Sequence, residues 1–468
     1  MRPKILDYFQ VKSFEVASST IAEDDIRFSA DYFLSSDNIK YQSNVKFIEL
    51  SELAKVIFPG IFKRIFVDNS QFGMPFITTS GMMEYSPQPE KYLSFLLTTN
   101  LNIYQVEEDW ILVSRSGTIG NAVFTSKNLT KFAITEDALR VIPYDKQNIG
   151  FLYFYISSDY GKDLIVGKKG GAVVDHIYEE DLNKLKIPII LDSIINTLQQ
   201  KYLEVKLLRE EANDLLKEAN KLVYDYNHLP AIDLADAKFY DTQREIQSRV
   251  LKSSFVSGGY RLDAHFYNPI AELAINNIQS NALSNKLLSD VATCAYMGSR
   301  ASRNYVEKGF GVQFLSGKNI IQIRPTDPKY ISKQETSNLD ELLLKKGWIL
   351  ITRSGTLGRT VLVWNNFEDM AASEHLIRVM PLENDTDPGY LYAFLNSDYG
   401  YQQLIKCKHG AVIDEITEDQ IGETLVPIPK LQEQKVIGDK VRLAYEKRAK
   451  AIRLEDEAQE ILKQSLTG

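Results

Sequence analysis

The chain has 468 residues, of which 44% are hydrophobic and 25% charged, so it is not a largely disordered or collagen-like protein and more than one domain is expected. Its 54 Lys and Arg against 62 Asp and Glu give a net charge of −8, which at first argues against a nucleic-acid binder. The two cysteines, Cys294 and Cys407, cannot form a disulfide framework and fit a reducing compartment. Because no stretch has the pattern of a signal peptide or a membrane span, we expect a soluble, cytoplasmic protein without a membrane partner.

The sequence contains a long internal repeat. The stretch WILVSRSGTIG, which begins at Trp110, returns 238 residues later as WILITRSGTLG at Trp348. Further matches have an offset of 234 near the front and offsets of 238 and then 239 beyond it, over roughly 27–227 and 261–466. The offset of 238 relates two pairs of charged residues, Glu136 with Glu374 and Arg140 with Arg378. Because solenoid repeats have only about 20–45 residues, this pattern predicts a duplicated domain.

Each repeat ends in a long predicted helix. The second, over 431–466, has no proline and is rich in Ala, Leu, Glu and Lys, which are strong helix formers. Seven apolar positions recur in both copies at spacings close to the 3.5-residue period of a coiled coil. These seam positions are Leu198, Tyr202, Val205, Ala212, Leu215, Ala219 and Leu222 in the first helix, and Ile437, Val441, Ala444, Ala451, Leu454, Ala458 and Ile461 in the second. A helix of about 50 Å with so thin a seam is unstable alone, so we expect the two to pack on each other.

Charged flanks accompany each apolar seam. They are Glu210, Glu211, Lys217 and Glu218 in the first helix, and Arg448, Lys450, Glu455 and Glu457 in the second. A helix buried on several sides would not keep charges along its whole length. The flanks therefore favour a helix pair, with two separate long core helices as the alternative.

The residues before each long helix are predicted to form short strands, turns and short helices. Trp110–Ser114 and Trp348–Thr352 are apolar, β-branched runs that end in Ser-Gly turns, a pattern typical of strands. Gly150–Tyr160 and Gly389–Tyr399 are rich in Tyr, Phe and Leu and are predicted as short helices. The fold class is therefore α+β.

We find no catalytic or metal-binding pattern. The loop Gly311–Asn319 has the wrong spacing for a phosphate-binding loop and lacks the Ser or Thr that binds magnesium. The five histidines show no H-x-x-x-H pairing, and no C-x-x-C occurs, so no metal site is assigned. The acid pairs Glu179-Glu180 and Glu418-Asp419 are typical of the first turn of a helix. We therefore expect no catalytic residue and no cofactor.

Taken together, these features resemble the DNA-specificity (S) subunit of type I restriction–modification systems. The likeness is carried by the repeated W-I-L-[VI]-[ST]-R-S-G-T-[IL]-G stretch, by G-A-V-[VI]-D at Gly171–Asp175 and Gly410–Asp414, and by Pro427–Ile437, which leads into the second long helix. Tyr260–Pro269 looks like the domain opening of that family. The start of the first helix, 187–197, departs from the family because it lacks the Gln-Glu-Gln run. The resemblance covers nearly the whole chain.

The resemblance implies a definite architecture. Two tandem, mixed α/β target-recognition domains would be joined by two long helices packed as an antiparallel coiled coil, with pseudo-two-fold symmetry from internal duplication. The expected segments are 1–190 for the first target-recognition domain, 191–228 for the first spacer helix, 229–258 for a connector, 259–428 for the second domain and 429–468 for the second spacer helix.

The resemblance also implies a protein without catalysis of its own. Each domain would read one half of a split, asymmetric site on double-stranded DNA. Two DNA adenine methyltransferase subunits would dock on this frame, and a restriction or translocase subunit is a further expected partner. Two alternatives stay open: a non-catalytic scaffold that binds partners with little DNA readout, and the recognition half of a fused enzyme, against which the missing catalytic motifs argue. Much of the acidity lies on the helix flanks and the connector, which predicts that the chain does not hold DNA alone.

Ten basic residues are candidate DNA contacts. Lys168, Lys169, Lys406 and Lys408 lie in equivalent Gly-containing loops, which either approach phosphates or are solvated surface loops. Arg115 and Arg353 follow equivalent strands and either contact DNA or stabilise the fold by a hydrogen bond. The last four lie in the variable front of each domain, where an arginine can pair with guanine: Lys63, Arg64, Arg300 and Arg303.

Overall fold

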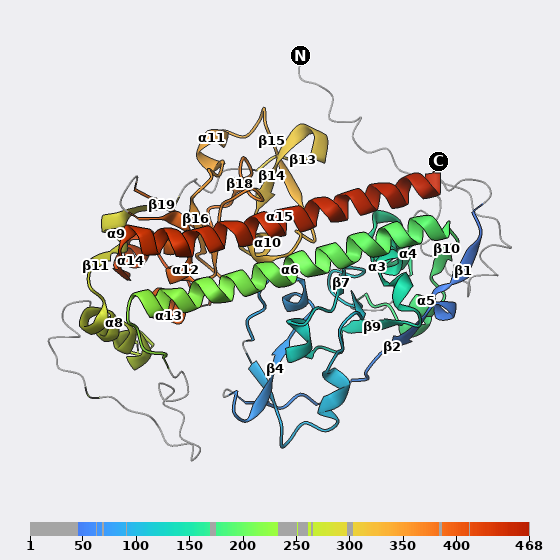
Figure 1. The fold of residues 1–468 in the computed structure, drawn as a ribbon, viewed down its shortest axis with the longest axis horizontal. Helices are drawn as coiled ribbons and strands as arrows, with labels where there is room; N and C mark the ends of the chain where they lie inside the picture. Colours follow the sequence, from blue (N-terminus) through green and yellow to red (C-terminus); the bar gives the residue numbers. More distant parts are fainter. Residues whose placement is uncertain are drawn as a thin grey trace. The chain divides into compact units, whose positions relative to one another are not determined.

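The computed structural model describes residues 45–61, 63–67, 70–89, 91–168, 175–232, 250, 261–263, 265–296, 303–382, 386–410 and 412–467. The chain forms two compact units (Figure 1). Unit 1 comprises 1–82, 89–203 and 454–468, and unit 2 comprises 83–88 and 204–453. Each unit therefore contains one mixed domain together with part of both long helices.

In unit 1 the described strands form three small sheets. The large sheet has the order β2-β9-β6-β7 and is wholly antiparallel. The small sheet has the order β3-β5-β4-β8, in which β4 and β8 are parallel, and β1 pairs with β10. The strands are β1 (Phe47–Glu49), β2 (Ala54–Ile57), β3 (Phe66–Val67), β4 (Gly73–Ile77), β5 (Lys91–Ser94), β6 (Ile111–Ser114), β7 (Ala122–Phe124), β8 (Ala133–Ile134), β9 (Ala138–Pro143) and β10 (Lys186–Pro188).

Unit 2 repeats this topology strand by strand. Its sheets have the orders β12-β19-β16-β17, β13-β15-β14-β18 and β11-β20. The strands are β11 (Asn285–Leu287), β12 (Ala292–Tyr296), β13 (Tyr305–Val306), β14 (Gly311–Leu315), β15 (Lys329–Ser332), β16 (Ile349–Thr352), β17 (Thr360–Leu362), β18 (Ala371–Ala372), β19 (Leu376–Pro381) and β20 (Leu425–Pro427). The register agrees as well, since Phe76 lies opposite Ala133 in unit 1 and Phe314 opposite Ala371 in unit 2. The predicted α+β duplication is therefore confirmed.

Short helices complete each domain. Those in unit 1 are α3 (Ile149–Ser157), α4 (Asp159–Gly167) and α5 (Glu179–Asn183). Those in unit 2 are α8 (Pro269–Asn281), α9 (Leu288–Val291), α10 (Gly317–Ile321), α11 (Leu339–Leu342), α12 (Pro388–Leu395), α13 (Asp398–Lys406) and α14 (Glu418–Gly422). Single 3-10 turns are η2 (Leu50–Glu52), η3 (Gly81–Met83), η4 (Leu101–Tyr104), η5 (Leu129–Lys131), η6 (Lys146–Asn148) and η7 (Lys308–Phe310). The acid pairs of α5 and α14 stand in first turns, as predicted.

The predicted helix at Gly150–Tyr160 is in fact two helices, because Ser158 begins a new one. Its Oγ accepts a hydrogen bond from the backbone N–H of Gly161 at 3.1 Å, which caps α4. A Cβ on Gly161 would lie 2.1 Å from the carbonyl oxygen of Tyr155, so only glycine fits this sharp corner. Ser397 caps α13 in the same way.

In the described part of each domain, the small sheet has a hydrophobic cluster of its own. The four residues of β6 and the four of β16 are buried in the large sheets, where the strands were predicted. The small sheet of unit 1 has a core of its own around Phe76, Leu93 and Tyr104. In unit 2 the corresponding cluster is formed by Phe314, Ile331 and Ala371. The small sheet is thus a distinct lobe of each domain.

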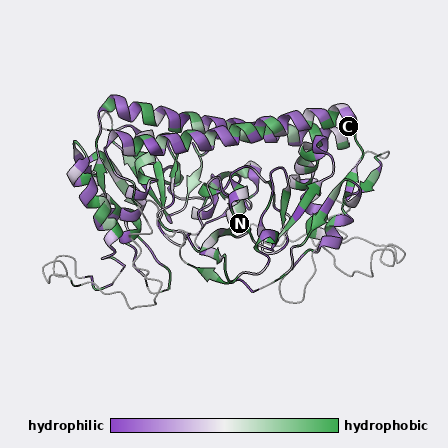
Figure 2. Ribbon diagram, turned by 60° about the horizontal axis from the view of Figure 1, so that its bottom comes forward, coloured by the Kyte–Doolittle hydropathy of each residue, from purple (hydrophilic) through white to green (hydrophobic). Residues whose placement is uncertain are grey.

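The long helices α6 (Asp192–Tyr226) and α15 (Leu431–Thr467) lie side by side and antiparallel (Figures 1 and 2). Residue numbers rise along α6 as those of their ion-pair partners on α15 fall. The pairs are Lys201–Glu457 at 2.6 Å in unit 1, and Glu204–Lys450 at 2.6 Å, Glu211–Lys447 at 2.7 Å and Glu218–Lys440 at 2.8 Å in unit 2. The first and last pairs are equivalent at an offset of 239, so the duplication extends to the contacts between the helices. Both helices lie within the predicted segments 191–228 and 429–468.

Most of the predicted seam is buried, although Leu215, Leu222 and Ile461 are only half-buried, and the long helices also bury charged residues. Of the charged flank, Arg448 and Glu455 are only 5% and 3% exposed. In unit 1 the hydroxyl of Tyr153 donates to Glu455 at 2.8 Å, and in unit 2 the guanidinium of Arg448 stacks on Tyr85 at 4.2 Å. The prediction that these two charges face solvent is wrong, because each helix packs on a domain as well as on the other helix.

One glycine in the second long helix has a packing reason. A Cβ on Gly389, at the start of α12, would lie 2.7 Å from the Cα of Gly438 in α15. The two backbones therefore approach more closely than any side chain permits. In unit 1 the equivalent approach is made by Gly150, whose Cβ would lie 2.7 Å from the carbonyl oxygen of Leu198. These contacts anchor each domain to the helix beside it.

Residues 83–88 come from the segment between β4 and β5 but belong to unit 2. The carboxylate of Glu84 pairs with Arg359 at 3.0 Å, and both side chains are less than 15% exposed. The backbone N–H of Tyr85 donates to the carbonyl of Ile321 at 3.2 Å. The predicted first domain, 1–190, therefore includes a short piece that packs with unit 2.

Only part of the predicted connector, 229–258, lies within the described residues. Leu229 and Ile232 are buried in the core of unit 2, so the chain after α6 packs directly on this unit. Among the helices of the described residues, none has a stretch long and apolar enough to cross a membrane.

Candidate nucleic-acid interface

Each small sheet carries two cations on aromatic rings. In unit 1 the guanidinium of Arg64, just before β3, lies 5.3 Å from the ring centre of Phe76 on β4. The ammonium of Lys91 on β5 lies 5.3 Å from the ring of Phe66 on β3. The rings keep these cations on the sheet while part of each charge remains accessible.

Unit 2 repeats both pairs at equivalent positions. Arg303 lies 4.7 Å from the ring of Phe314, and Lys329 lies 5.4 Å from the ring of Tyr305. The two sheets thus share a pattern of basic residues interleaved with aromatic ones, which is typical of nucleic-acid binding surfaces. Sequence reasoning missed Lys91 and Lys329, although the offset of 238 relates them.

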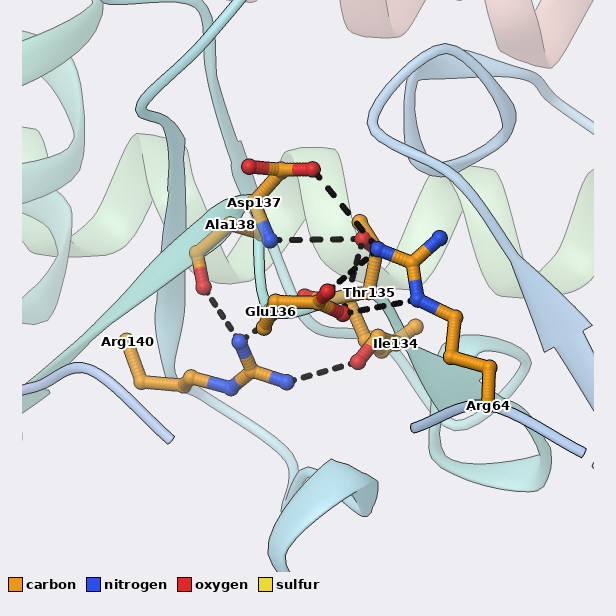
Figure 3. Close-up of polar contacts among 7 residues, drawn as sticks. All are labelled: Arg64, Ile134, Thr135, Glu136, Asp137, Ala138 and Arg140. Carbon is orange, nitrogen blue, oxygen red and sulfur yellow. Dashed lines mark hydrogen bonds and ion pairs between the residues drawn. The ribbon is translucent and has the colours of Figure 1, made fainter. Parts of the chain in front are cut away.

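A carboxylate fixes the arginine beside each small sheet, and Figure 3 shows the contacts in unit 1. In unit 1, Glu136 accepts from Nη2 of Arg64 and from its Nε at 3.2 Å, and Asp137 lies 3.8 Å from Nη2. In unit 2, Glu374 accepts from Nη2 of Arg303. The carboxylates are almost buried whereas the arginine side chains are about 30% exposed, 30% for Arg64 and 31% for Arg303. Such a pair holds the guanidinium plane in one orientation.

A second arginine holds the loop that carries each carboxylate. Arg140, 1% exposed, donates to the carbonyl oxygens of Ile134 at 2.8 Å and Thr135 at 2.9 Å, and also to that of Ala138 (Figure 3). Burial lowers the pKa of Arg140 to about 10, so the guanidinium stays charged at neutral pH. This loop joins β8 of the small sheet to β9 of the large one, so Arg140 fixes the joint between the sheets.

Arg378 plays the same part in unit 2. It is fully buried and donates to the carbonyl oxygens of Ala372 at 2.8 Å, Ser373 at 3.3 Å and Leu376 at 2.9 Å. Burial lowers its pKa to about 10 as well. The Glu and Arg that repeat in the sequence therefore act together in each unit. The buried arginine holds the loop, and the glutamate on that loop orients a second, more exposed arginine.

Arg115 and Arg353 are engaged within their domains. Arg115 is 5% exposed and its guanidinium lies 4.3 Å from the ring of Phe58 and 5.5 Å from that of Tyr178. Arg353 pairs with Glu415 at 3.2 Å. These contacts support the fold-stabilising alternative for both residues. Arg353 forms a hydrogen-bonded ion pair, and Arg115 packs against two rings.

The basic loops after α4 and α13 lie only partly within the described residues. Lys168 follows α4, and Lys169 lies outside the described residues, as does Arg300. In unit 2 the ammonium of Lys406 lies 4.6 Å from the ring of Phe266, and Lys408 pairs with Asp414 at 3.1 Å.

Lys63 is exposed next to Arg64. Arg261, which the sequence placed only in the domain opening, donates to the carbonyl oxygens of Cys407 at 3.0 Å and Lys408 at 2.7 Å. The structure therefore brings Lys63 and Arg64 together with Lys91 on one lobe, whereas the Lys406–Lys408 loop is tied to the start of its own domain.

In the described part of the chain, no three His, Cys, Asp or Glu side chains come together as a metal site would require. A cavity of about 50 Å³ beside Arg359 and Tyr445 in unit 2 is far smaller than a pocket for a nucleotide cofactor. The cations and aromatic rings of the two small sheets form surfaces that suit a polyanion.

The chain contains two copies of one mixed domain. Each copy has a small sheet with cations on aromatic rings, and each is followed by a long helix. This arrangement defines a duplicated binding protein. The sequence matches the family described as the type I restriction modification DNA specificity domain twice, over residues 42–205 and 286–448. The chain belongs to this family. It is accordingly a DNA-recognition subunit of a type I restriction–modification system, and this family of specificity subunits is not catalytic.

Several solved structures are similar over most of their length. The S subunit of the type I restriction–modification system from M. genitalium shares 14% identity over 92% of this chain and 98% of that one, with a TM-score of 0.34. The HsdS subunit from Thermoanaerobacter tengcongensis shares 14% identity over 93% and 99%, with a TM-score of 0.29. No curated protein matches the sequence significantly. The assignment rests on the double family match.

Proposed function

We propose that this chain reads a bipartite, asymmetric DNA site, with one half-site contacted by each unit. Two DNA adenine methyltransferase subunits would dock on it, a restriction or translocase subunit would complete the assembly, and the complex would act on DNA in the cytoplasm. The observation that carries the proposal is the repeated small sheet with its fixed arginine. The same scaffold occurs twice with the same cation–aromatic pairs, as two readers of two half-sites require.

The side chains around these equivalent positions differ, which supports asymmetric reading. Residues 60–100 of the first copy contain three Lys and Arg and three Asp and Glu. The equivalent residues 298–338 contain seven Lys and Arg and three Asp and Glu. The first segment therefore has a formal charge of zero and the second a charge of +4, although the strand order is the same. Two readers of one palindromic site would have no reason to diverge in this way.

Exposed apolar side chains on the long helices support protein partners. Leu207 on α6 is 54% exposed, and Val436 and Leu443 on α15 are 41% and 43% exposed. Such side chains on an otherwise charged helix pair are typical of a docking surface. We assign these side chains to a contact with a methyltransferase subunit, because they lie on the long helices rather than on the small sheets.

A domain exchange tests the two-reader proposal. The chain is co-expressed with its methyltransferase partner, and the methylated sites are mapped across the host DNA. Replacement of residues 259–428 by the equivalent domain of another family member is expected to alter one half of the methylated site and leave the other half unchanged. Alteration of both halves would contradict the proposal. Co-purification with the methyltransferase without site-specific methylation would instead favour the scaffold alternative.

A further inference from the structure

The turn that follows β5 is built in the same way in both units. In unit 1 the backbone N–H of Leu97 donates to Oγ of Ser94 at 3.2 Å, and that of Thr98 donates to the carbonyl oxygen of Ser94 at 3.1 Å. Asn100 ends the turn in the left-handed conformation, with φ of 54°. Asparagine is among the residues that tolerate this conformation best.

Unit 2 has the same turn after β15. The N–H of Glu335 donates to Oγ of Ser332 at 3.1 Å, and the N–H of Thr336 donates to the carbonyl oxygen of Ser332 at 3.3 Å. Asn338 takes the left-handed position, with φ of 56°. The serine, threonine and asparagine that define the backbone are thus equivalent at an offset of 238.

The side chains displayed by the two turns are opposite in character. In unit 1 they are Phe95, Leu96 and Leu97, which are 53%, 89% and 56% exposed. In unit 2 the three equivalent residues are Lys333, Gln334 and Glu335, which are also exposed. Since the same turn forms with polar residues, folding does not require the apolar ones. Three adjacent exposed apolar side chains that the fold does not need indicate a binding surface.

The residues around this apolar turn favour DNA as its binding partner. The N–H of Phe95 donates to the carbonyl oxygen of Phe72 at 2.9 Å, and Phe72 is itself 49% exposed, so a fourth apolar side chain adjoins the turn. Lys91 begins the strand that leads into the turn, and Arg64 lies just before β3 of the same small sheet. Cations that engage phosphates beside apolar side chains that reach the bases are the combination found where proteins press apolar wedges into DNA grooves.

We propose that Phe95–Leu97 is an apolar reading wedge, which contacts the bases of the half-site read by unit 1, and that Lys333–Glu335 contacts polar groups of the other half-site from the same place. Apolar side chains discriminate bases through the thymine methyl group and through the ease with which a base step opens. The inference rests on the proposed function and identifies a segment that sets its specificity.

A graft between the two turns tests this wedge. Phe95→Lys, Leu96→Gln and Leu97→Glu together place the side chains of unit 2 on a backbone that already accepts them. In the complex co-expressed with the methyltransferase, we expect methylation at the original site to fall about 10–100-fold, and any new preference to lie in the half-site of unit 1 only. The single change Leu96→Gln, at the most exposed position, is expected to act in the same direction more weakly.

The outcomes are distinct. An unchanged methylated sequence and rate in both variants would overturn the wedge. The wedge would also be overturned if the methyltransferase were lost from the purified complex while thermal melting showed that the variant chain was still folded. That result would identify the turn as a protein contact. The exchange of residues 259–428 serves as the control, because it tells which half-site belongs to unit 1. If that exchange alters one half-site and the graft does nothing, the wedge fails while the two-reader function stands.

Discussion

Arg303 forms an ion pair with Glu374, a carboxylate of which only 10% of the side chain is exposed. The ring of Phe314 lies 4.7 Å from the guanidinium on another side. Two contacts of this kind leave the guanidinium little freedom to rotate, so the entropy lost when it binds a further group is small. The same three-residue arrangement recurs at Arg64, Glu136 and Phe76 in unit 1.

We predict that each of these arginines acts on one half-site only. Arg303→Ala should relax the half-site read by unit 2, and Arg64→Ala the half-site read by unit 1, because an oriented guanidinium contributes about 1–3 kcal/mol of discrimination when it pairs with guanine. The measurement is methylation mapping with the co-expressed complex. Arg303→Lys is the matched control, because it retains the positive charge but loses the planar guanidinium. Compared with Arg303→Ala, it should therefore recover more of the DNA affinity than of the sequence specificity. Equal loss at both half-sites would argue against a direct role.

The buried arginine beside this pair is predicted to stabilise the fold instead. Arg378→Met removes the donors of three buried carbonyl groups and should cost about 3–5 kcal/mol in the free energy of unfolding of unit 2. Arg303→Met should cost less than Arg378→Met, because the side chain that it removes is 31% exposed. Hydrogen exchange of the β16 and β19 amides measures the difference, with β6 and β9 of unit 1 as internal reference. Similar protection in the two variants would contradict this division of roles.

Much of the architecture could be predicted because the sequence contains two copies of the same domain. A match such as Trp110 with Trp348 locates the duplicated domains without any knowledge of packing. The apolar seams predicted the helix pair, since burial of one stripe leaves a period in the sequence. Local signals worked as well: Gly117 and Gly355 both have positive φ in the turns where they were expected.

Side-chain contacts between distant segments could not be predicted in this way. Nothing in the sequence near Arg64 indicates that its partner is Glu136, 72 residues away. The sequence pattern places Arg448 and Glu455 on a solvent-exposed flank. Charge and helical period alone do not reveal that this side of the helix is buried against a domain. The exposed turn at Phe95–Leu97 was missed for the opposite reason, because an apolar run after a strand is usually a core segment.

The small residues of the helix seam are predicted to be essential for close packing. Ala451 and its counterpart Ala212 are both fully buried. Ala451→Leu adds three carbon atoms to a packed interface and should cost about 1–3 kcal/mol in the free energy of unfolding. Lys440→Ala, which removes only the partly exposed pair with Glu218, should cost less than about 1 kcal/mol. Thermal melting of the two variants provides the comparison, and an equal shift would mean that the ion pairs, not the seam, hold the helices together.

Lys168 and Lys169 are predicted to contact phosphates rather than bases. If they do, Lys168→Ala with Lys169→Ala should weaken binding of the assembled complex equally for every DNA sequence, because phosphates are the same at each position. The slope of log affinity against log salt should also become shallower by about one for each lost contact, since fewer counterions are released. Filter binding over a series of salt concentrations, with a matched and a mismatched duplex, measures both quantities. Arg303→Ala gives the contrast, since it should reduce binding to the matched duplex more than to the mismatched one. An unchanged salt slope in the lysine variant would assign this loop to the solvated surface.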